Sequence, residues 1–180
     1  MQKDIYSQTR DIIVKYYKDK IPTAYIHSFG CQQNINDGEK IKGVIQSCGF
    51  SISTQEETAD LIIYNTCAVR EHAQDRVYGN IGNLKHLKEK NKSLLIGICG
   101  CMTEQQITKD KIKKSFPHVN FAIGTNAINT IPEIIKYNLE KEKLDSAHNE
   151  MASKLMDNYI EVARKSGKSE IDIKKKVMQH

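Results

Sequence analysis

The stretch ADLIIYNTC, residues 59–67, is a strongly apolar run that ends in two polar residues and a cysteine. A run of this kind predicts a strand buried on both faces, which is typical of the parallel sheets of α/β proteins. Other β-rich runs lie on either side of it, with helix-type sequence between most of them: TAYIHSF (23–29), FSIST (50–54), LLIGICG (94–100) and NFAIGT (120–125).

This alternation predicts an α/β domain with a doubly wound, mostly parallel five-stranded sheet and helices on both faces. The simplest strand order is 2-1-3-4-5, as in flavodoxin-like sheets. Helices are predicted over about 36–48, 67–90 and 104–115, and from about residue 129 onward.

Three segments follow from the same patterns. The sequence pattern predicts an N-terminal helical extension over residues 1–22, which ends at Pro22. It predicts the α/β domain over residues 23–142 and a helical tail over residues 143–180. The tail shows no β-type pattern. Four of its apolar side chains recur at helical spacing and are expected on one face: Met151, Leu155, Tyr159 and Val162.

Composition limits the classes of function. The 180 residues are 39% hydrophobic and 27% charged, with a net charge of +5, which permits a nucleic-acid partner without requiring one. No run is apolar and long enough for a membrane span or a secretory signal, so we expect a cytoplasmic protein with no membrane partner. In a reducing compartment its five cysteines are metal ligands, nucleophiles or buried thiols rather than structural disulfides.

Cys31, Cys67 and Cys101 each follow directly after a predicted strand. In a 2-1-3-4-5 sheet those strands are neighbours and their carboxyl ends share one edge, so the three thiols should converge at helix N-termini that stabilise thiolates. An iron–sulfur cluster, zinc with a fourth ligand, and inert buried thiols all remain open on this spacing alone. The chain has no close C-x-x-C pair of the zinc type. It also has no phosphate-binding glycine motif. A nucleophilic cysteine would need a histidine base: His27 lies inside the first strand and only His72 is near enough to be considered, but three convergent thiols exceed what nucleophilic catalysis requires.

Four motifs make the chain recognisable. In order they are GCQQN (30–34), ADLIIYNTCAVRE (59–71), IGICGCMTEQ (96–105) and GTN (124–126). Together they resemble the amino-terminal domain of the tRNA methylthiotransferase family over about residues 23–140. The residues after the first and second cysteines are most similar to the branch that makes 2-methylthio-N(6)-isopentenyladenosine beside the tRNA anticodon.

The resemblance implies that Cys31, Cys67 and Cys101 ligate an auxiliary [4Fe–4S] cluster whose open iron holds the sulfur for the nucleoside. It also implies tRNA as substrate, an RNA-binding domain, and a radical domain with S-adenosylmethionine and a second [4Fe–4S] cluster. The radical domain needs C-x-x-x-C-x-x-C, which this sequence lacks, so the chain alone should not complete methylthiolation. The alternative is a non-catalytic iron–sulfur or zinc module that acts with a separate radical enzyme.

Several single residues carry further expectations. Asn34 and Asn65 flank two of the cysteine loops and could cap local N–H groups or hydrogen-bond a cluster sulfur. Arg70 is expected to face cluster or substrate charge, because a cation in the first turn of a helix opposes the helix dipole. Cys48 and Cys99 are expected to pack in the core.

The remaining charged residues have simpler interpretations. Asp37 and Glu39 are expected at the N-terminus of the helix over 36–48, where carboxylates favour the dipole. The lysines at the end of the helix before the fourth strand are expected to be a solvated helix end: Lys85, Lys88, Lys90 and Lys92.

Overall fold

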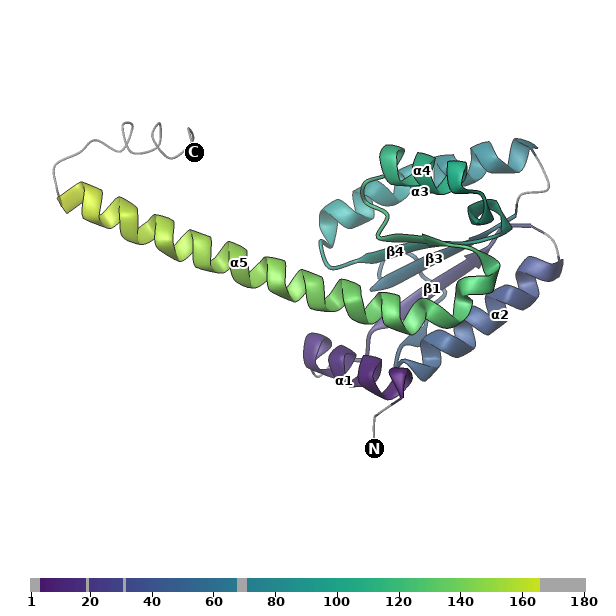
Figure 1. Ribbon diagram of the computed structural model, residues 1–180, viewed down its shortest axis with the longest axis horizontal. Helices are drawn as coiled ribbons and strands as arrows, with labels where there is room; N and C mark the ends of the chain where they lie inside the picture. The colour runs from purple at the N-terminus through teal and green to yellow at the C-terminus, as the bar shows by residue number, and fades with distance from the viewer. Residues whose placement is uncertain (1–3, 19, 31, 68–70, 166–180) are drawn as a thin grey trace. The chain divides into compact units, whose positions relative to one another are not determined.

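The computed structural model describes residues 4–18, 20–30, 32–67 and 71–165. Its sheet has five strands in the order β2-β1-β3-β4-β5, and every neighbouring pair is parallel (Figure 1). The predicted fold class and strand order are therefore confirmed. The strands are β1 (Thr23–Ser28), β2 (Ser51–Ile52), β3 (Leu61–Thr66), β4 (Leu95–Gly100) and β5 (Phe121–Ile123).

Helices connect and cover these strands. The longer ones are α1 (Ile5–Tyr17), α2 (Gln32–Ser47), α3 (Glu71–Lys90), α4 (Gln106–Ser115) and α5 (Ile131–Lys165). Two short 3₁₀ helices, η1 (Cys101–Glu104) and η2 (Thr125–Thr130), follow β4 and β5.

Two predicted helix boundaries were wrong. The first helix ends at Tyr17, where Lys18 adopts a positive φ of 55°, rather than at Pro22. The second begins at Gln32 rather than near residue 36, so Asp37 lies in its second turn and not at its N-terminus. Asp37 is buried there, and its carboxylate accepts hydrogen bonds from Gln33 and Lys40.

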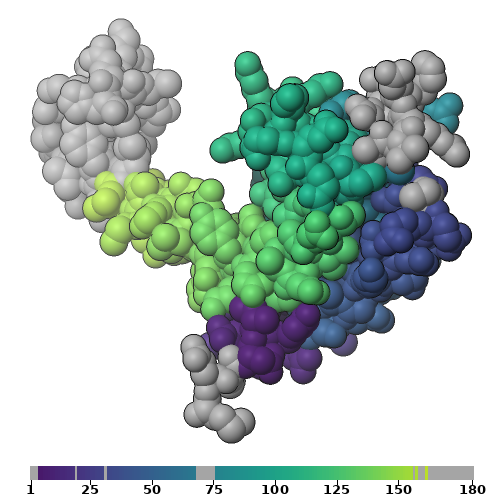
Figure 2. Space-filling model, turned by 45° about the vertical axis from the view of Figure 1, so that its right-hand side comes forward, coloured from purple at the N-terminus to yellow at the C-terminus, as the bar shows by residue number. Residues whose placement is uncertain are grey.

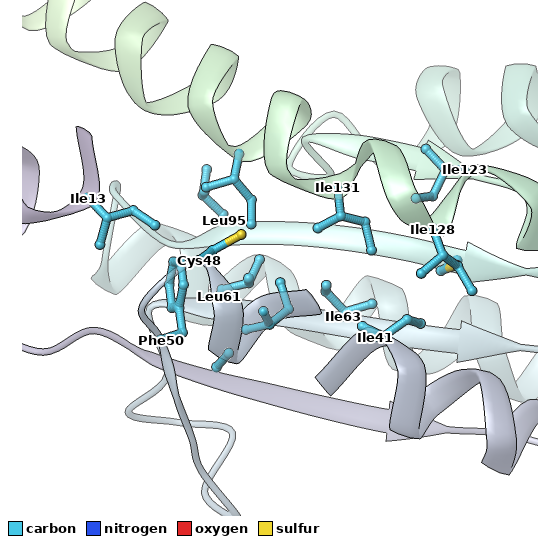
Figure 3. Packing of buried hydrophobic residues seen from close by; sticks show 14 of the residues in the cluster. Ile13, Ile41, Cys48, Phe50, Leu61, Ile63, Leu95, Ile123, Ile128 and Ile131 are labelled. Carbon is cyan, nitrogen blue, oxygen red and sulfur yellow. The ribbon is translucent and has the colours of Figure 1, made fainter. Parts of the chain in front are cut away.

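Side chains from alternate positions of the strands point to opposite faces of the sheet. On one face, Leu61 and Ile63 of β3 and Leu95 of β4 pack under α1, α2 and the first turns of α5 (Figures 1 and 3). This first core contains almost only aliphatic side chains. The helices contribute Ile13, Ile41, Ile45, Ile131, Ile135 and Leu139.

The other face carries a second core under α3 and α4. Ile62, Ile96 and Ile98 of the central strands pack there against both helices. The side chains of α3 recur at helical spacing, as an amphipathic helix requires: Val77, Ile81, Leu84 and Leu87. Burial on both faces explains why β3 and β4 are continuous apolar runs in the sequence.

The helix α1 is tied to the same face as α2 and α5. Asp4 caps its N-terminus by accepting a hydrogen bond from the backbone N–H of Ser7 at 2.9 Å. The buried Thr9 hydroxyl donates to the carbonyl of Pro132, and Arg10 donates to the carbonyl of Ser47. These bonds connect α1 to both neighbouring helices.

The chain divides into two compact units, Met1–Glu140 and Lys141–His180. Within the second unit α5 continues as a helix to Lys165, with Leu144, Met151 and Leu155 exposed. The predicted helical character of the tail is found in the described part; residues 166–180 lie outside it. In the part of the chain that the structure describes, no helix combines the length and the apolar character that crossing a membrane would need.

Candidate cluster site at the carboxyl edge of the sheet

The strands β1, β3 and β4 end at the same level. Ser28 of β1 pairs with Asn65 of β3, and Thr66 of β3 pairs with Gly100 of β4. Cys67 and Cys101 are the next residues after that last pair, so they leave the sheet from adjacent positions. The predicted convergence of these two cysteines is thus what the sheet register produces.

Cys67 lies against the start of the β1–α2 connection. It is buried, and a Cβ built on Gly30 would stand 2.4 Å from the Cβ of Cys67 and 3.3 Å from its Sγ. A side chain at position 30 would clash with Cys67, and the backbone there has a φ of +134°, which residues with a Cβ rarely adopt. Both features require glycine. Cys31 and Arg70, two of the predicted site residues, lie outside the described residues. Gly30, the last described residue before Cys31 in the sequence, is therefore in contact with Cys67.

Cys101 begins η1 on the other side of Cys67. Its side chain is half-buried, and its Sγ lies 3.7 Å from the carbonyl oxygen of Thr66. The turn that places it requires Gly100, which has a φ of +118°. A Cβ on Gly100 would be 2.1 Å from the carbonyl oxygen of Thr66 and 2.6 Å from its nitrogen. The backbones of β3 and β4 therefore meet at van der Waals contact just before the two cysteines.

Two buried asparagines hold α2 to the end of β3. Asn65 donates from Nδ2 to the carbonyl of Asn34 at 2.6 Å and to the Ser28 hydroxyl at 3.3 Å. Asn34 donates from Nδ2 to the carbonyl of Thr66 at 3.0 Å and to Oδ1 of Asn65 at 3.3 Å. Buried amides cost free energy unless they are hydrogen-bonded. This reciprocal arrangement therefore strongly favours one position of the first turn of α2 against the end of β3.

Two threonines fix the end of β4 and the start of η1. The Thr66 hydroxyl donates to the carbonyl of Cys99 at 2.9 Å. The Thr103 hydroxyl, which is fully buried, lies within hydrogen-bond distance of the carbonyls of Gly100 and Ile123. Sequence reasoning did not single out these residues or Ser28. A polar side chain inside or just after a continuous apolar strand is the signal that could have found them.

Glu104 links η1 to the segment after β5. Its carboxylate accepts a hydrogen bond from the Thr125 hydroxyl at 2.9 Å and lies 3.5 Å from the backbone nitrogen of Asn126. These two groups lower the pKa of Glu104 below its ordinary value. The cysteine loop after β4 is therefore anchored to η2 as well as to β3.

Replacing Glu104 by glutamine should lower the melting temperature near neutral pH, where the carboxylate is ionised. The pKa of Glu104 is lower in the folded protein, so its contribution is present above the unfolded pKa of about 4.3 and is lost as the pH falls through the folded value. Melting curves of both proteins at several pH values check this. Glu150→Gln, on an exposed carboxylate that pairs with Lys154, is the matched control. A constant difference down to acidic pH would contradict the assignment.

The other two cysteines belong to the first core. Cys48 and Cys99 are both fully buried, and burial raises the pKa of their thiols to about 11 and about 12. Cys99 is only two residues from Cys101, yet its side chain points to the face covered by α5 and η2. The structure thus separates this pair as the sequence suggested.

The histidines considered as bases have other surroundings. The exposed His27 lies among aromatic rings, with Tyr25, Phe29 and Tyr64 within 6.2 Å between ring centroids, and its Nδ1 is 3.3 Å from the Tyr25 hydroxyl. The side chain of His72 lies outside the described residues. Within the described ranges no group of three or more His, Cys, Asp or Glu side chains is placed to hold a metal ion.

The residues present fit a cluster better than a hard metal ion. Thiolates are soft ligands that suit iron–sulfur clusters, copper(I) and zinc, whereas the described groups closest to Cys67 and Cys101 are neutral amides, hydroxyls and backbone carbonyls. Gly30 and Gly100 let the backbone approach Cys67 and Thr66 more closely than a residue with a Cβ could. Amide and backbone groups around sulfur are the kind of environment that tunes such clusters.

Comparison with known proteins gives a consistent result. A sequence model described as "Uncharacterized protein family UPF0004" matches residues 23–124. Relatives include a protein of Caldicellulosiruptor saccharolyticus, 41% identical over 157 residues, which cover 86% of this chain and 33% of the relative. Another is from Alkaliphilus oremlandii, 44% identical over 127 residues, with 71% of this chain and 27% of the relative covered. Both are named tRNA-2-methylthio-N(6)-dimethylallyladenosine synthase.

A third relative, from Clostridioides difficile, has the same name and is 37% identical over 142 residues, which cover 79% of this chain and 29% of that protein. The chain spans about a third of the length of these relatives. The family match covers more than half of this chain, including all five strands and the three cysteines Cys31, Cys67 and Cys101. The chain therefore belongs to the UPF0004 family, as a counterpart of the amino-terminal part of tRNA methylthiotransferases.

Proposed function

We propose that this chain is the cluster-binding domain of a tRNA methylthiotransferase, in which Cys31, Cys67 and Cys101 ligate an auxiliary [4Fe–4S] cluster. The observation that carries the proposal is the approach of Gly30 to Cys67, next to the level strand ends from which Cys67 and Cys101 emerge. Cys67 and Cys101 thus lie at one edge of the sheet, and Gly30, the residue before Cys31 in the sequence, lies against Cys67. The names of the relatives support tRNA as the substrate.

When bound, such a cluster would have one iron without a protein ligand, which can hold the sulfur that is transferred to the nucleoside. The residues of this chain would bind and orient it. Gly30 and Gly100 allow the backbone to lie against Cys67 and Thr66. Asn34 and Asn65 hold the start of α2 against the end of β3. Thr103 and Glu104 keep η1, and with it Cys101, in place against β5 and η2.

The rest of the reaction would depend on groups outside these motifs. The radical that activates the adenine carbon requires S-adenosylmethionine and a second cluster bound by C-x-x-x-C-x-x-C, which this sequence does not contain. We propose that a radical domain and an RNA-binding domain supply these functions in the same chain or in a partner. An oxygen-sensitive cluster and a tRNA substrate are both suited to the cytoplasm.

Anaerobic reconstitution with ferrous iron and sulfide tests the proposal. We expect about four irons and four sulfides per chain, a brown protein, and an electron paramagnetic resonance signal after reduction. Incubation of a parallel sample with zinc alone is the control. Stoichiometric zinc binding by a folded protein that retains no iron would contradict the cluster and favour a zinc module. Failure to bind either metal would contradict both.

A further inference from the structure

The positive charge of the chain is concentrated in one region. Residues 85–114 contain eight lysines and three acidic residues, a net charge of +5, which equals the net charge of the whole chain. The rest of the sequence is thus neutral overall. This region comprises the end of α3, the strand β4 with η1, and α4. The lysines are therefore gathered on the face of the sheet that carries the second core.

Several lysines of the other helices are held in ion pairs with carboxylates of their own helix. Lys40 and Lys42 in α2, Lys85 in α3 and Lys154 in α5 each pair with a carboxylate three or four residues away. In the described part of the chain, the α4 lysines form no ion pair (Lys109, Lys111, Lys113 and Lys114).

Asp110, the acidic residue of α4, accepts a hydrogen bond from Gln106 instead. Lys109 is close enough to Glu104 to help lower the pKa of that carboxyl, but Glu104 is bonded to Thr125 and Asn126. The charge of α4 is therefore available to a partner.

A groove runs between α4 and β5. It has a volume of about 470 Å³. Two lysines and one carboxylate line it, together with two amide side chains and apolar residues: Lys109, Lys113, Asp110, Gln106, Asn120, Ile112, Pro117, Val119, Phe121 and Ala122. Among the described residues β5 pairs with β4 alone, so one side of its backbone has no partner in the sheet. The groove thus combines cations, amide groups, an apolar surface and an open strand edge.

The surface that carries this groove is held firmly. The rings of Tyr78 in α3 and Phe116 after α4 stack at 5.9 Å and an interplanar angle of 7°. The Nζ of Lys111 lies 4.0 Å from the centroid of the Tyr78 ring, and His118 lies 2.7 Å from the carbonyl of Ile81. The α4 region forms a ridge with side chains that stand out from the surface in Figure 2 (green-teal). A partner would meet a preformed surface.

We propose that α4 and the α4–β5 groove form an RNA-binding surface, with lysines on the phosphates and the groove occupied by one unpaired nucleotide. RNA fits better than an acidic protein, because the groove offers cations beside an apolar, amide-lined space of nucleotide size. The position also suits the proposed function, on which this inference rests: α4 follows η1, so Lys109 lies only eight residues from Cys101. The short helix η1 thus connects the cysteine edge directly to the start of α4.

Fluorescence anisotropy of a labelled, unmodified tRNA transcript, titrated with the whole chain at several salt concentrations, tests the surface. The double variant Lys109→Gln/Lys113→Gln should bind more weakly, and the slope of log K against log salt should fall by about two, one for each lost phosphate contact. The matched control is Lys40→Gln/Lys42→Gln, which removes the same charge from α2. It should keep the slope of the unchanged chain.

Equal losses in the two double variants would overturn the proposal, since binding would then follow net charge alone. Absence of RNA binding by the unchanged chain, or displacement of RNA by an equal charge of polyglutamate, would also overturn it. Iron is counted in the same samples. RNA binding by a chain that binds no iron would contradict the proposed cluster but support the RNA-binding surface. Iron binding without RNA binding would contradict the RNA-binding surface alone.

Discussion

Replacing Cys101 by alanine is expected to reduce the iron bound after anaerobic reconstitution from about four per chain to about zero. Two remaining thiolates cannot hold a four-iron cluster against loss to solvent. The same loss is expected for Cys67→Ala and Cys31→Ala. Iron and sulfide analysis, with the electron paramagnetic resonance signal of the reduced protein, measures the effect.

Cys99→Ala is the sharpest control, because Cys99 is two residues from Cys101 and lies in the first core. It should cost about 1–2 kcal/mol of stability for the lost sulfur but leave the bound iron unchanged. Cys48→Ala, in the same core, is a second control. A cluster that survives Cys101→Ala and is lost in Cys99→Ala would reverse the assignment within this pair.

The sheet could be predicted from the sequence because each central strand is recognisable from its own consecutive residues. β3 and β4 are buried on both faces, so each is an uninterrupted apolar run bounded by polar residues. The right-handed crossover rule then leaves few topologies, and the simplest one was observed. The short strand β2 was overestimated: the N–H of Ser53 still donates to the carbonyl of Ala24 in β1, but the Ser53 hydroxyl bonds to the backbone of Gln55, where the chain turns away.

The helix starts were harder to predict because polar side chains serve distant partners. Asn34 and Asp37 look like residues that precede or begin a helix, yet both lie inside α2. Asn34 is there because it binds the carbonyl of Thr66, which is 32 residues away. A pattern of capping residues cannot show a bond of this kind, since it depends on the assembled sheet.

The strand ends from which Cys67 and Cys101 emerge could be predicted from the sequence, but the hydrogen bonds that hold those strand ends could not. The strand-end cysteines follow from topology, which the sequence encodes well. The bonds of Thr103 to Ile123 in β5 and of Thr125 to Glu104 join residues 20 and 21 positions apart and become visible only in the structure. The unpaired charge of α4 was also missed, because the spacing of Asp110 to Lys113 and Lys114 suggests ion pairs that the structure does not form.

Among single glycine-to-alanine substitutions at this site, Gly100→Ala is expected to lower the free energy of unfolding the most. A φ of +118° is costly for any residue with a Cβ, by about 1–3 kcal/mol. The added Cβ would also meet the backbone of Thr66 at 2.1 Å, and a strand in the centre of the sheet cannot move aside as a flexible side chain can. Overpacking of this kind adds about 1–3 kcal/mol.

The free energy of unfolding should therefore fall by about 4 kcal/mol, with a decrease in the melting temperature of about 8–16 °C. Because β3 and β4 must separate to admit the methyl group, Cys67 and Cys101 should also move apart. Chemical denaturation of the apo protein measures the first effect. Iron binding at a temperature where the variant is still folded measures the second, so a loss of cluster can be separated from a loss of fold.

Gly43→Ala is the matched control and should have the opposite sign. Gly43 lies within α2, where a Cβ would have no heavy atom within 4 Å, and alanine there favours the helix by about 0.5–1 kcal/mol. The same chemical change should thus stabilise the protein at residue 43 and strongly destabilise it at residue 100. A Gly100→Ala protein as stable as the unchanged chain would mean that the strand ends are not in contact, and the proposed geometry of the cysteine edge would be wrong.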